Sequence, residues 1–572
     1  MVLDNADDDD VFFSADEDGG GTAQTSEAMR QKRPLATFLP QAPHGLILIT
    51  SRNSTAASNL VGTYDDIVKV EPMEVEDALA LLRTRVSISG SDEDDAKALV
   101  QALECIPLAI THAASYIKTR APMTTIASYL QFFRESEANQ ARLLDAKELR
   151  DLRRDPSIRH AVIATWKISF DQIQKTGPAA AELLALMSMF DRQGIPVSLL
   201  QGQVSRLDFE DAVAPLLSFS LVRAEIGQQS FEMHHLVQLS TRRWLEANDQ
   251  LDRWKTESVR MLAEVFPSGE YETWVECRQL LPHSRKVLDY NQEEREAALH
   301  WARIARNTGW YLLYIGEYAA AADSIKDAML ARERLLGAEH PDTLTSVSQL
   351  GTVLSSRAEY EEAEAMQRRA LAGYEKALGV EHPHTLTSVS QLGTVLSSQG
   401  KYEEAEAIQR RALAGEEKVL GVEHLHTLIS VSQLGTVLSS QGKYEEAEAM
   451  HRRALAGEEK ALGVEHPDTL TSMANLASTF WRQGRLNEAE DLEVCVMETR
   501  KRVLGDEHPA TLTAMINLAL TLKSRSRNQE ALTLLQTCVQ MQTRVLGGQH
   551  PDTESSLETL AEWKMESMEL GN

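Results

Sequence analysis

The feature that most constrains this chain is a phrase that returns every 42 residues through its C-terminal half. One histidine stands at the same place in each copy, at His340, His382, His424, His466, His508 and His550. Segments 387–420 and 429–462 are identical at 30 of 34 positions. A fixed period of about 20–50 residues is typical of solenoids, in which each unit stacks on its neighbours. The sequence therefore predicts a repeat architecture for this half.

Each period contains two helical patterns separated by a short turn. In the first clear unit, apolar residues recur at steps of three and four from Leu344 to Leu354, which makes one apolar helix face. A second amphipathic pattern runs over residues 360–378, and later copies place a glycine in the turn between the two, as at Gly400. Gly379 and Pro383 then give the usual stop and start signals of helices. We expect a stack of antiparallel helix pairs, an α-solenoid.

These helices resemble the tetratricopeptide repeat at its small and large positions, which are Leu350, Gly351, Tyr360, Ala363 and Ala370. The 42-residue period with the phrase LGxEHPxTL is similar to the repeat of kinesin light chains. The resemblance implies about six units over residues 298–549, the first of them degenerate, and a cap helix over residues 550–572.

Two interpretations of the periodic histidines compete. Zinc ligands converge to about 2 Å from one ion, whereas stacked helices stand about 8–10 Å apart. The spacing therefore favours histidines that pack at the turns between repeats, and we predict no metal site.

A second 42-residue series carries side-chain amides on the first helix of each pair, at Gln349, Gln391, Gln433, Asn475 and Asn517. In tetratricopeptide repeats this helix lines the concave groove. Amides both donate and accept hydrogen bonds, so such a ladder suits an extended protein or peptide ligand. The alternative is that the ladder only joins neighbouring helices.

Composition excludes several classes of partner. The chain has 58 Lys and Arg against 85 Asp and Glu, a net charge of −27, and no broad basic tract. Because phosphate affinity comes from clustered basic residues, we expect neither nucleic acid nor an anionic membrane as a partner. Four dispersed cysteines without a CxxC pair argue against disulfides and zinc modules. With no signal peptide and no apolar run long enough to span a bilayer, a cytoplasmic protein is expected.

The N-terminal half begins as an α/β pattern. Residues 46–49 form a short, fully apolar run that predicts a buried parallel strand. It ends in Thr50-Ser51-Arg52-Asn53, and the carboxyl ends of such strands are where α/β folds bind ligands.

Several phrases over residues 1–245 resemble the NB-ARC domain, the nucleotide switch of STAND proteins and NOD-like receptors. MVLDNADD resembles the end of its Walker B strand, HGLILITSRN its sensor strand, IPLA its GLPLA motif and FEMHHLVQ its MHD motif, in the family's order. AVIATWKISFDQI and GIPVSLL resemble the start of its winged-helix region. Combined with 42-residue repeats, the pattern resembles fungal NLR-like proteins.

The resemblance implies a mainly α chain with a partial α/β core. The expected domains are the C-terminal part of an NB-ARC domain (1–112), a helical ARC segment (113–160), a winged-helix-like region (161–245), a helical connector (246–297), the repeats (298–549) and the cap (550–572).

Four residues match nucleotide-binding positions of that family. The resemblance implies that Asp4 approaches Mg²⁺ through water and that Arg52 reads the γ-phosphate of ATP. It also implies that Pro107 packs against adenine and that His234 contacts the β-phosphate of ADP. The alternatives are that Asp4 is a solvated residue of an acidic stretch and His234 a buried histidine between hairpin and helix. The family often has a second acid where Asn5 stands, and an aspartate at 235 where this chain has another histidine.

A phosphate loop of the GxxxxGK[ST] kind does not occur in the sequence. The dipeptide Gly-Lys stands only at 400–401 and 442–443, each time before a tyrosine inside a repeat. The chain begins within the Walker B phrase, so we expect a truncated or degenerate nucleotide-binding domain, and neither ATP hydrolysis nor tight ADP binding.

These patterns favour a non-enzymatic, NLR-like regulator of signalling. Its solenoid would sense a protein or peptide, its NB-ARC region would retain a degenerate ADP/ATP switch that acts with Mg²⁺ in the intact family, and that region would support self-association. The alternative is a cargo or scaffold adaptor like a kinesin light chain. That class predicts a heptad coiled coil ahead of the repeats, and no sustained heptad pattern occurs there.

Overall fold

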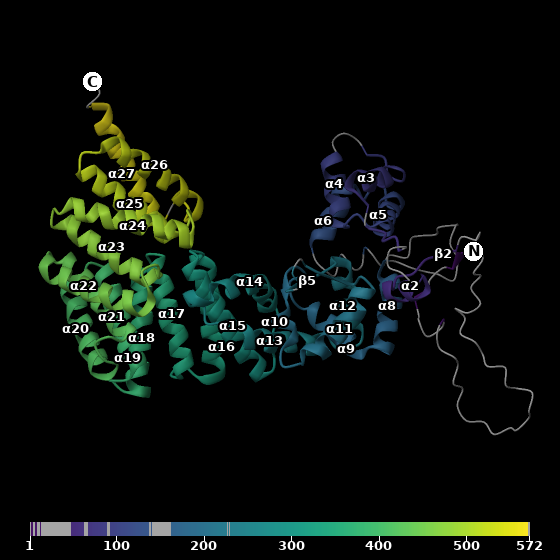
Figure 1. The fold of residues 1–572 in the computed structure, drawn as a ribbon, viewed down its shortest axis with the longest axis horizontal. Helices are drawn as coiled ribbons and strands as arrows, with labels where there is room; N and C mark the ends of the chain where they lie inside the picture. Colours follow the sequence, from purple (N-terminus) through teal and green to yellow (C-terminus); the bar gives the residue numbers. More distant parts are fainter. Residues whose placement is uncertain are drawn as a thin grey trace, which may run out of the picture. The chain divides into compact units, whose positions relative to one another are not determined.

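The computed structural model describes residues 2–3, 6–7, 12, 47–61, 67–71, 73–88, 92–135, 139, 143, 162–225, 227, 229–548 and 550–569. The chain is mainly α-helical and divides into two compact units (Figure 1). The first unit comprises residues 1–265 and 285–290, and the second comprises residues 266–284 and 291–572. The acidic and glycine-rich stretch at 13–40, and Asp4, lie outside the described residues.

The first unit opens with two short parallel strands, β1 (Val2–Leu3) and β2 (Leu48–Ile49). The parallel strand expected over residues 46–49 is therefore confirmed for its described part. Its predicted burial is wrong at Leu48, which is 56% exposed, because two paired strands cannot cover both of their own faces. Helix α2 (Ser54–Val61) follows the strand directly.

A helical layer comes next in the first unit, built from α3 (Val75–Arg83), α4 (Glu93–Ala102), α5 (Pro107–Thr119) and α6 (Ile126–Glu135). Leu82, Leu99, Ile110 and Tyr129 from these four helices are fully buried together. The short connection between α4 and α5 carries two non-glycine residues with positive φ, Glu104 and Cys105.

The rest of the first unit combines helices with a small antiparallel sheet of order β3-β5-β4. The strands are β3 (Ile195–Pro196), β4 (Val222–Ala224) and β5 (Ser230–Met233). The helices are α8 (Val162–Thr176), α9 (Pro178–Met187), α10 (Val197–Gln201), α11 (Arg206–Ser218), α12 (His235–Ala247) and α13 (Leu251–Val265). The β4–β5 hairpin leads straight into α12.

The second unit is a solenoid of six helix pairs. After the 3₁₀ turn η2 (Tyr271–Thr273) and α14 (Trp274–Leu288), whose last residues belong to the first unit, the pairs begin at α15. They are α15 (Arg295–Tyr314) with α16 (Tyr318–Leu336), α17 (Pro341–Ser356) with α18 (Tyr360–Leu378), α19 (Pro383–Ser398) with α20 (Tyr402–Val419), α21 (Leu425–Ser440) with α22 (Tyr444–Leu462), α23 (Pro467–Arg482) with α24 (Leu486–Leu504), and α25 (Pro509–Ser524) with α26 (Asn528–Val545). A final helix, α27 (Pro551–Glu569), packs on α26.

Local predictions for the repeats hold. Helix α18 covers the expected range, 360–378. The turn glycines Gly400 and Gly442 have φ of +79° and +81°, the left-handed conformation that ends the preceding helix. First helices of successive pairs also contact one another, α17 with α19 and α19 with α21, which places them on the inner side of the curve.

The periodic histidines are helix N-caps. Each Nδ1 accepts a hydrogen bond from the backbone N–H two residues further on, at 3.1–3.2 Å. This bond satisfies one of the backbone donors that the first turn of a helix leaves over. The prediction that these histidines lie at the turns between repeats is confirmed. Over the described residues, no group of three or more His, Cys, Asp or Glu is placed to hold a metal ion, and no described helix combines the length and apolarity of a membrane span.

Ion pairs join consecutive repeats along the second helices. Glu364 contacts Lys401 at 2.8 Å, and Glu406 contacts Lys443 at 2.9 Å, one period later. The hydrogen bond from each lysine is the main cause that lowers the pKa of both carboxyl groups to about 2. The same link recurs between Glu448 and an arginine of the next turn. A continuous series of such pairs fixes the register between neighbours, although each exposed pair contributes less than about 1 kcal/mol.

One buried position of the second helix is polar in all six repeats, although the residue type varies between them. Its occupants are Arg332, Tyr374, Glu416, Glu458, Arg500 and Gln542. Glu416 and Glu458 are each only 1% exposed, and their Oε2 atoms have no hydrogen-bond partner among the described residues. Burial raises the pKa of both groups to about 7, although a serine hydroxyl of the following helix partly offsets it. These two carboxyl groups are therefore largely protonated below neutral pH.

We predict that replacing both groups, Glu416→Gln with Glu458→Gln, stabilises the protein at pH 8 and not at pH 4. The folded pKa of about 7 lies above the ordinary value of 4.5, so the folded state binds the proton more tightly. The tighter proton binding adds to the free energy of unfolding. This contribution is fully present below about pH 4.5 and is lost as pH rises through about 7, and it amounts to at most about 3 kcal/mol per group. Chemical denaturation at several pH values measures the difference between variant and wild type.

The matched control is Glu403→Gln, which makes the same change at an exposed position of α20. It should leave the pH profile unchanged. The comparison with wild type is needed because buried His451, whose pKa burial lowers to about 4, destabilises the fold in acid in all of these proteins. Equal pH profiles for the double variant and wild type would contradict the protonation of these glutamates.

Candidate functional site

The predicted amide ladder lies on the inner helices of the solenoid, and all five of its side chains are half-buried between neighbouring helices. Gln391 accepts a hydrogen bond from the Ser348 hydroxyl of the preceding pair, and Gln433 accepts one from Ser390 at 2.5 Å. Asn475 donates to Ser432 at 3.4 Å. The amides therefore take part in helix packing, and each still presents part of its surface to the groove.

The first glutamine of the ladder is bonded differently. The Oε1 atom of Gln349 is buried and has no hydrogen-bond partner among the described residues. A buried acceptor without a donor is costly, typically about 1–3 kcal/mol.

The ladder has one further rung that the sequence analysis missed. Asn307 stands 42 residues before Gln349, on α15, and is 5% exposed. Its Nδ2 donates to the backbone carbonyl of Phe266 at 3.4 Å, and its Oδ1 accepts from the Arg306 guanidinium. Counting back 42 residues from Gln349 leads to Asn307, but the histidine phrase that marks the other units is absent before α15.

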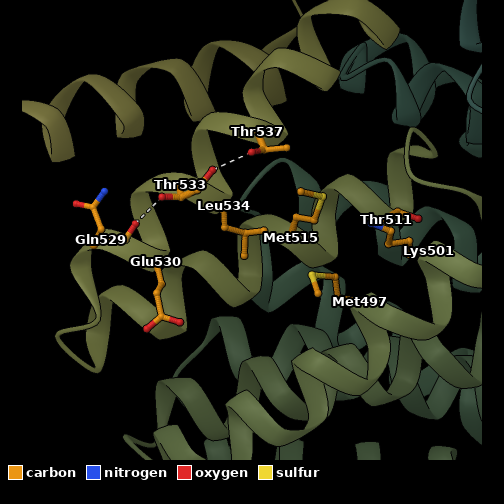
Figure 2. Close-up of a pocket in the computed structure, with 9 residues that line it drawn as sticks. All are labelled: Met497, Lys501, Thr511, Met515, Gln529, Glu530, Thr533, Leu534 and Thr537. Atoms are coloured by element: carbon orange, nitrogen blue, oxygen red, sulfur yellow. Dashed lines mark hydrogen bonds between the residues drawn. The ribbon is translucent and has the colours of Figure 1, made fainter.

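A cleft of about 470 Å³ opens near the C-terminal end of the solenoid (Figure 2). Met497, Met515 and Leu534 form its apolar wall, from three successive helices, and Lys501 and Glu530 also line it. The hydroxyls of Thr533 and Thr537 are occupied by backbone carbonyls of their own helix. The cleft offers packing surface rather than a set of converging polar groups.

In the first unit, Arg52 is held by Asp7. The Arg52 Nε and Nη2 atoms donate to one carboxylate oxygen of Asp7 at 2.8 and 2.5 Å, and the Arg52 backbone N–H donates to the other at 2.6 Å. This fork places the arginine at the carboxyl end of β2, as expected. Its guanidinium charge is already balanced there.

His234 and the segment before Pro107 come together in the structure. His234 is the N-cap of α12, and its Nδ1 lies 2.6 Å from Glu104 Oε2. At that distance a proton lies between the two atoms, so Nδ1 donates a hydrogen bond to Glu104. The Leu236 backbone N–H also approaches Nδ1, but at 3.3 Å this contact is the weaker of the two. Pro107 is exposed at the first turn of α5.

Glu104 and Arg192, which the sequence analysis missed, complete this cluster. Arg192 Nη1 contacts the other Glu104 oxygen at 2.9 Å, and the backbone N–H of His235 points to the same atom. Burial opposes ionisation of Glu104, but the hydrogen bond from His234 and the nearby positive groups hold its pKa below the usual value. Glu104 stands in the α4–α5 turn at positive φ, and no motif in the sequence marks it.

The described residues do not assemble a phosphate site. The two arginines near the predicted nucleotide-binding residues are already paired with carboxylates, Arg52 with Asp7 and Arg192 with Glu104. The Glu104 carboxylate lies 2.6 Å from His234 Nδ1, and a carboxylate there repels a phosphate because like charges repel. Asp4 and Asn5 lie outside the described residues.

Comparison with known protein families identifies the repeats. The tetratricopeptide repeat family matches residues 302–376, 348–418, 384–460, 427–499 and 511–552. A domain of unknown function (DUF7779) matches residues 171–250. The mainly α fold with a tetratricopeptide solenoid is thereby confirmed.

Among curated proteins, the chain is similar to a nucleotide-binding leucine-rich repeat (NLR)-like protein from Hyaloscypha variabilis. The two are 35% identical over 354 residues, which cover 61% of this chain and 34% of the relative. The chain therefore spans about a third of the length of the curated relative that it matches.

Solved structures similar to the chain include a putative kinesin light chain with nearly identical repeats from Podosopora anserina. It is 29% identical, with 36% of this chain and 98% of that chain covered and a TM-score of 0.30. Another is a STAND protein with a tetratricopeptide repeat sensor from Pyrococcus horikoshii. It is 14% identical, with 91% and 73% covered and a TM-score of 0.38.

We predict that this chain does not bind ADP with sub-micromolar affinity, because Arg52 and Arg192 are each paired with a carboxylate of the first unit. Isothermal titration calorimetry with ADP and Mg²⁺ measures it. Glu104→Gln serves as the comparison, since it removes the competing negative charge and should not weaken whatever binding exists. Sub-micromolar affinity in the wild-type chain would contradict the prediction.

Proposed function

Since the chain is a tetratricopeptide-repeat relative of NLR-like proteins, we propose that it is a non-enzymatic signalling regulator that binds a protein or peptide partner in its solenoid. The partner would lie along the inner helices α15, α17, α19, α21, α23 and α25. A switch of this kind responds through the difference in affinity between two conformations, not through chemistry.

One observation carries the proposal. Asn307, the first rung of the ladder, donates its side-chain amide to a main-chain carbonyl of a non-helical segment, Phe266. This is the interaction that the ladder would offer an extended peptide. Gln391 and Gln433 repeat the same chemistry at 42-residue intervals. Because packed helices stand about 8–10 Å apart and an extended chain advances about 3.4 Å per residue, peptide bonds about three residues apart in one ligand could engage successive rungs.

A degenerate nucleotide switch is the second part of the proposal. It is supported by the resemblance of residues 1–245 to NB-ARC and by the contact that joins His234 to the turn before Pro107. In the intact family ADP or ATP with Mg²⁺ would supply the switch, and self-association through this region would transmit the signal. We further propose a cytoplasmic location, which suits the four free cysteines.

The alternative, a cargo or scaffold adaptor without a nucleotide role, shares the same solenoid. The 35% identical relative is NLR-like, and this favours the regulator. The two proposals differ in the first unit, since only the regulator requires it to change state when the partner binds.

We predict that Gln391→Ala with Gln433→Ala weakens partner binding by about 5- to 100-fold, because two hydrogen bonds worth about 0.5–1.5 kcal/mol each are lost. The measurement compares partners recovered by full-length wild type and variant, followed by titration of the recovered partner. Unchanged affinity would remove the ladder from recognition.

The matched control is Ser348→Ala with Ser390→Ala. These hydroxyls donate to the same two glutamines, so the control removes the packing bonds and keeps the amides. If the amides serve only to pack helices, both double variants lower the melting temperature alike and neither affects binding selectively. If they recognise the partner, only the glutamine variant loses affinity.

A further inference from the structure

Residues 266–273 lie against the inner helix of the first repeat, at positions that correspond to the ladder. We call this stretch the groove segment. Glu270 has extended backbone angles, φ −69° and ψ 158°, and the stretch forms no strand or α-helix before the single turn η2. It is an extended piece of chain that occupies the place proposed above for a partner.

The groove segment is seated closely on α15. Asn307 binds the carbonyl of Phe266, and the Trp274 indole N–H donates to the carbonyl of Gly269 at 3.1 Å. Gly269 has φ +93°, and a Cβ there would stand 3.1 Å from Tyr311 N and 3.2 Å from Asn307 O. The close approach of two backbones therefore requires glycine at this position.

The same segment reaches a repeat far along the chain. The Tyr271 ring meets the ring of His466, the N-cap of α23, edge to face at 5.1 Å between centroids. Glu272 lies 3.5 Å from His466 Nε2. Trp274, which follows directly, stacks with His508 of the next repeat at 6.4 Å. The groove segment thus bridges the first inner helix and the start of α23 within the second unit.

The electrostatic environment of the segment is unfavourable. Glu270 is a partly buried carboxyl that faces Asp468 and Glu272, and only Arg306 and a hydrogen bond with Trp310 compensate it. Burial and these two acids raise the pKa of Glu270 above its usual value. A segment held by ring contacts and main-chain hydrogen bonds, with a carboxylate opposed by two others, is attached but replaceable.

We propose that the groove segment is a tethered competitor that covers the recognition site, and that the partner is an extended peptide carrying a small residue followed by an acidic–aromatic–acidic sequence like Gly269-Glu270-Tyr271-Glu272. The proposal rests on the function proposed above and adds the chemistry of the partner. It also explains how the site is kept closed, since a tethered ligand acts at an effective concentration of about millimolar.

The experiment uses the full-length chain and a fluorescent peptide with the sequence of residues 264–276, EVFPSGEYETWVE. The chain variant Gly269→Ala places a methyl group against the α15 backbone and should release the segment. We expect this variant to bind the peptide at least tenfold more tightly than wild type does in fluorescence polarisation. A peptide of scrambled sequence should bind neither protein.

Two controls separate release from general loosening. Glu276→Ala, an exposed position just beyond the segment, should leave peptide affinity at the wild-type value. His466→Ala added to Gly269→Ala should weaken peptide binding again, because the tyrosine then loses the ring it packs against. Melting curves confirm that each variant is folded. Should Gly269→Ala not fold, hydrogen exchange of wild type with saturating peptide replaces it, and amides of residues 266–273 should then exchange faster.

The outcomes distinguish this inference from the proposed function. If folded Gly269→Ala binds the peptide no better than wild type, or the peptide leaves exchange in residues 266–273 unchanged, the segment is a fixed part of the solenoid and the inference is wrong. Partner binding that still depends on Gln391 and Gln433 would then leave the proposed function intact. Tight peptide binding that does not depend on those glutamines would instead restrict recognition to the first and fifth repeats.

Discussion

The solenoid depends on one hydrogen bond that recurs at the start of α17, α19, α21, α23, α25 and α27, from a backbone N–H of the first helical turn to Nδ1 of the preceding histidine. Because Nδ1 accepts, the neutral imidazole carries its proton on Nε2, which points away from the helix that it caps. In His508 that Nε2 meets the carbonyl oxygen of Tyr314, 194 residues earlier. Burial lowers the pKa of His508, which keeps the ring in the neutral form that both contacts require. The cap of α25 thus also joins the last helix pair to the first.

The local structure could be predicted because its causes are local. Apolar spacing, the turn glycines and the proline after the histidine each act within one turn of helix, and α18 accordingly has the predicted bounds. The cap itself could also have been inferred, since a residue directly before a proline-started helix is an N-cap. The strand at 48–49 was found for the same reason, from a short apolar run, whereas its exposure depends on elements elsewhere in the chain.

The site could be predicted only in part, because its contacts join residues far apart. The 42-residue period predicted five amides on the inner helices, but it did not predict that serines of the preceding repeat form hydrogen bonds with them. Glu104 and Arg192 lie 88 residues apart, and their approach to His234 depends on how a hairpin and two helices pack. The contact of Tyr271 with His466 depends on the pitch of the whole superhelix, which no local pattern encodes.

Near-identical repeats raise the question of how one surface can be specific. The copies at 387–420 and 429–462 present almost the same side chains to the groove, so the ladder alone distinguishes poorly between registers of a peptide. Specificity must come from positions where the copies differ, and two residues near Glu270 of the groove segment, Arg306 and Trp310, stand at such positions. The next three repeats have serine and threonine at the places of Arg306 and Trp310, and the last two have alanine with serine and isoleucine with leucine. A partner would then be fixed in register by the first repeat and held along the others by repeated main-chain bonds, each weak alone but additive over their number.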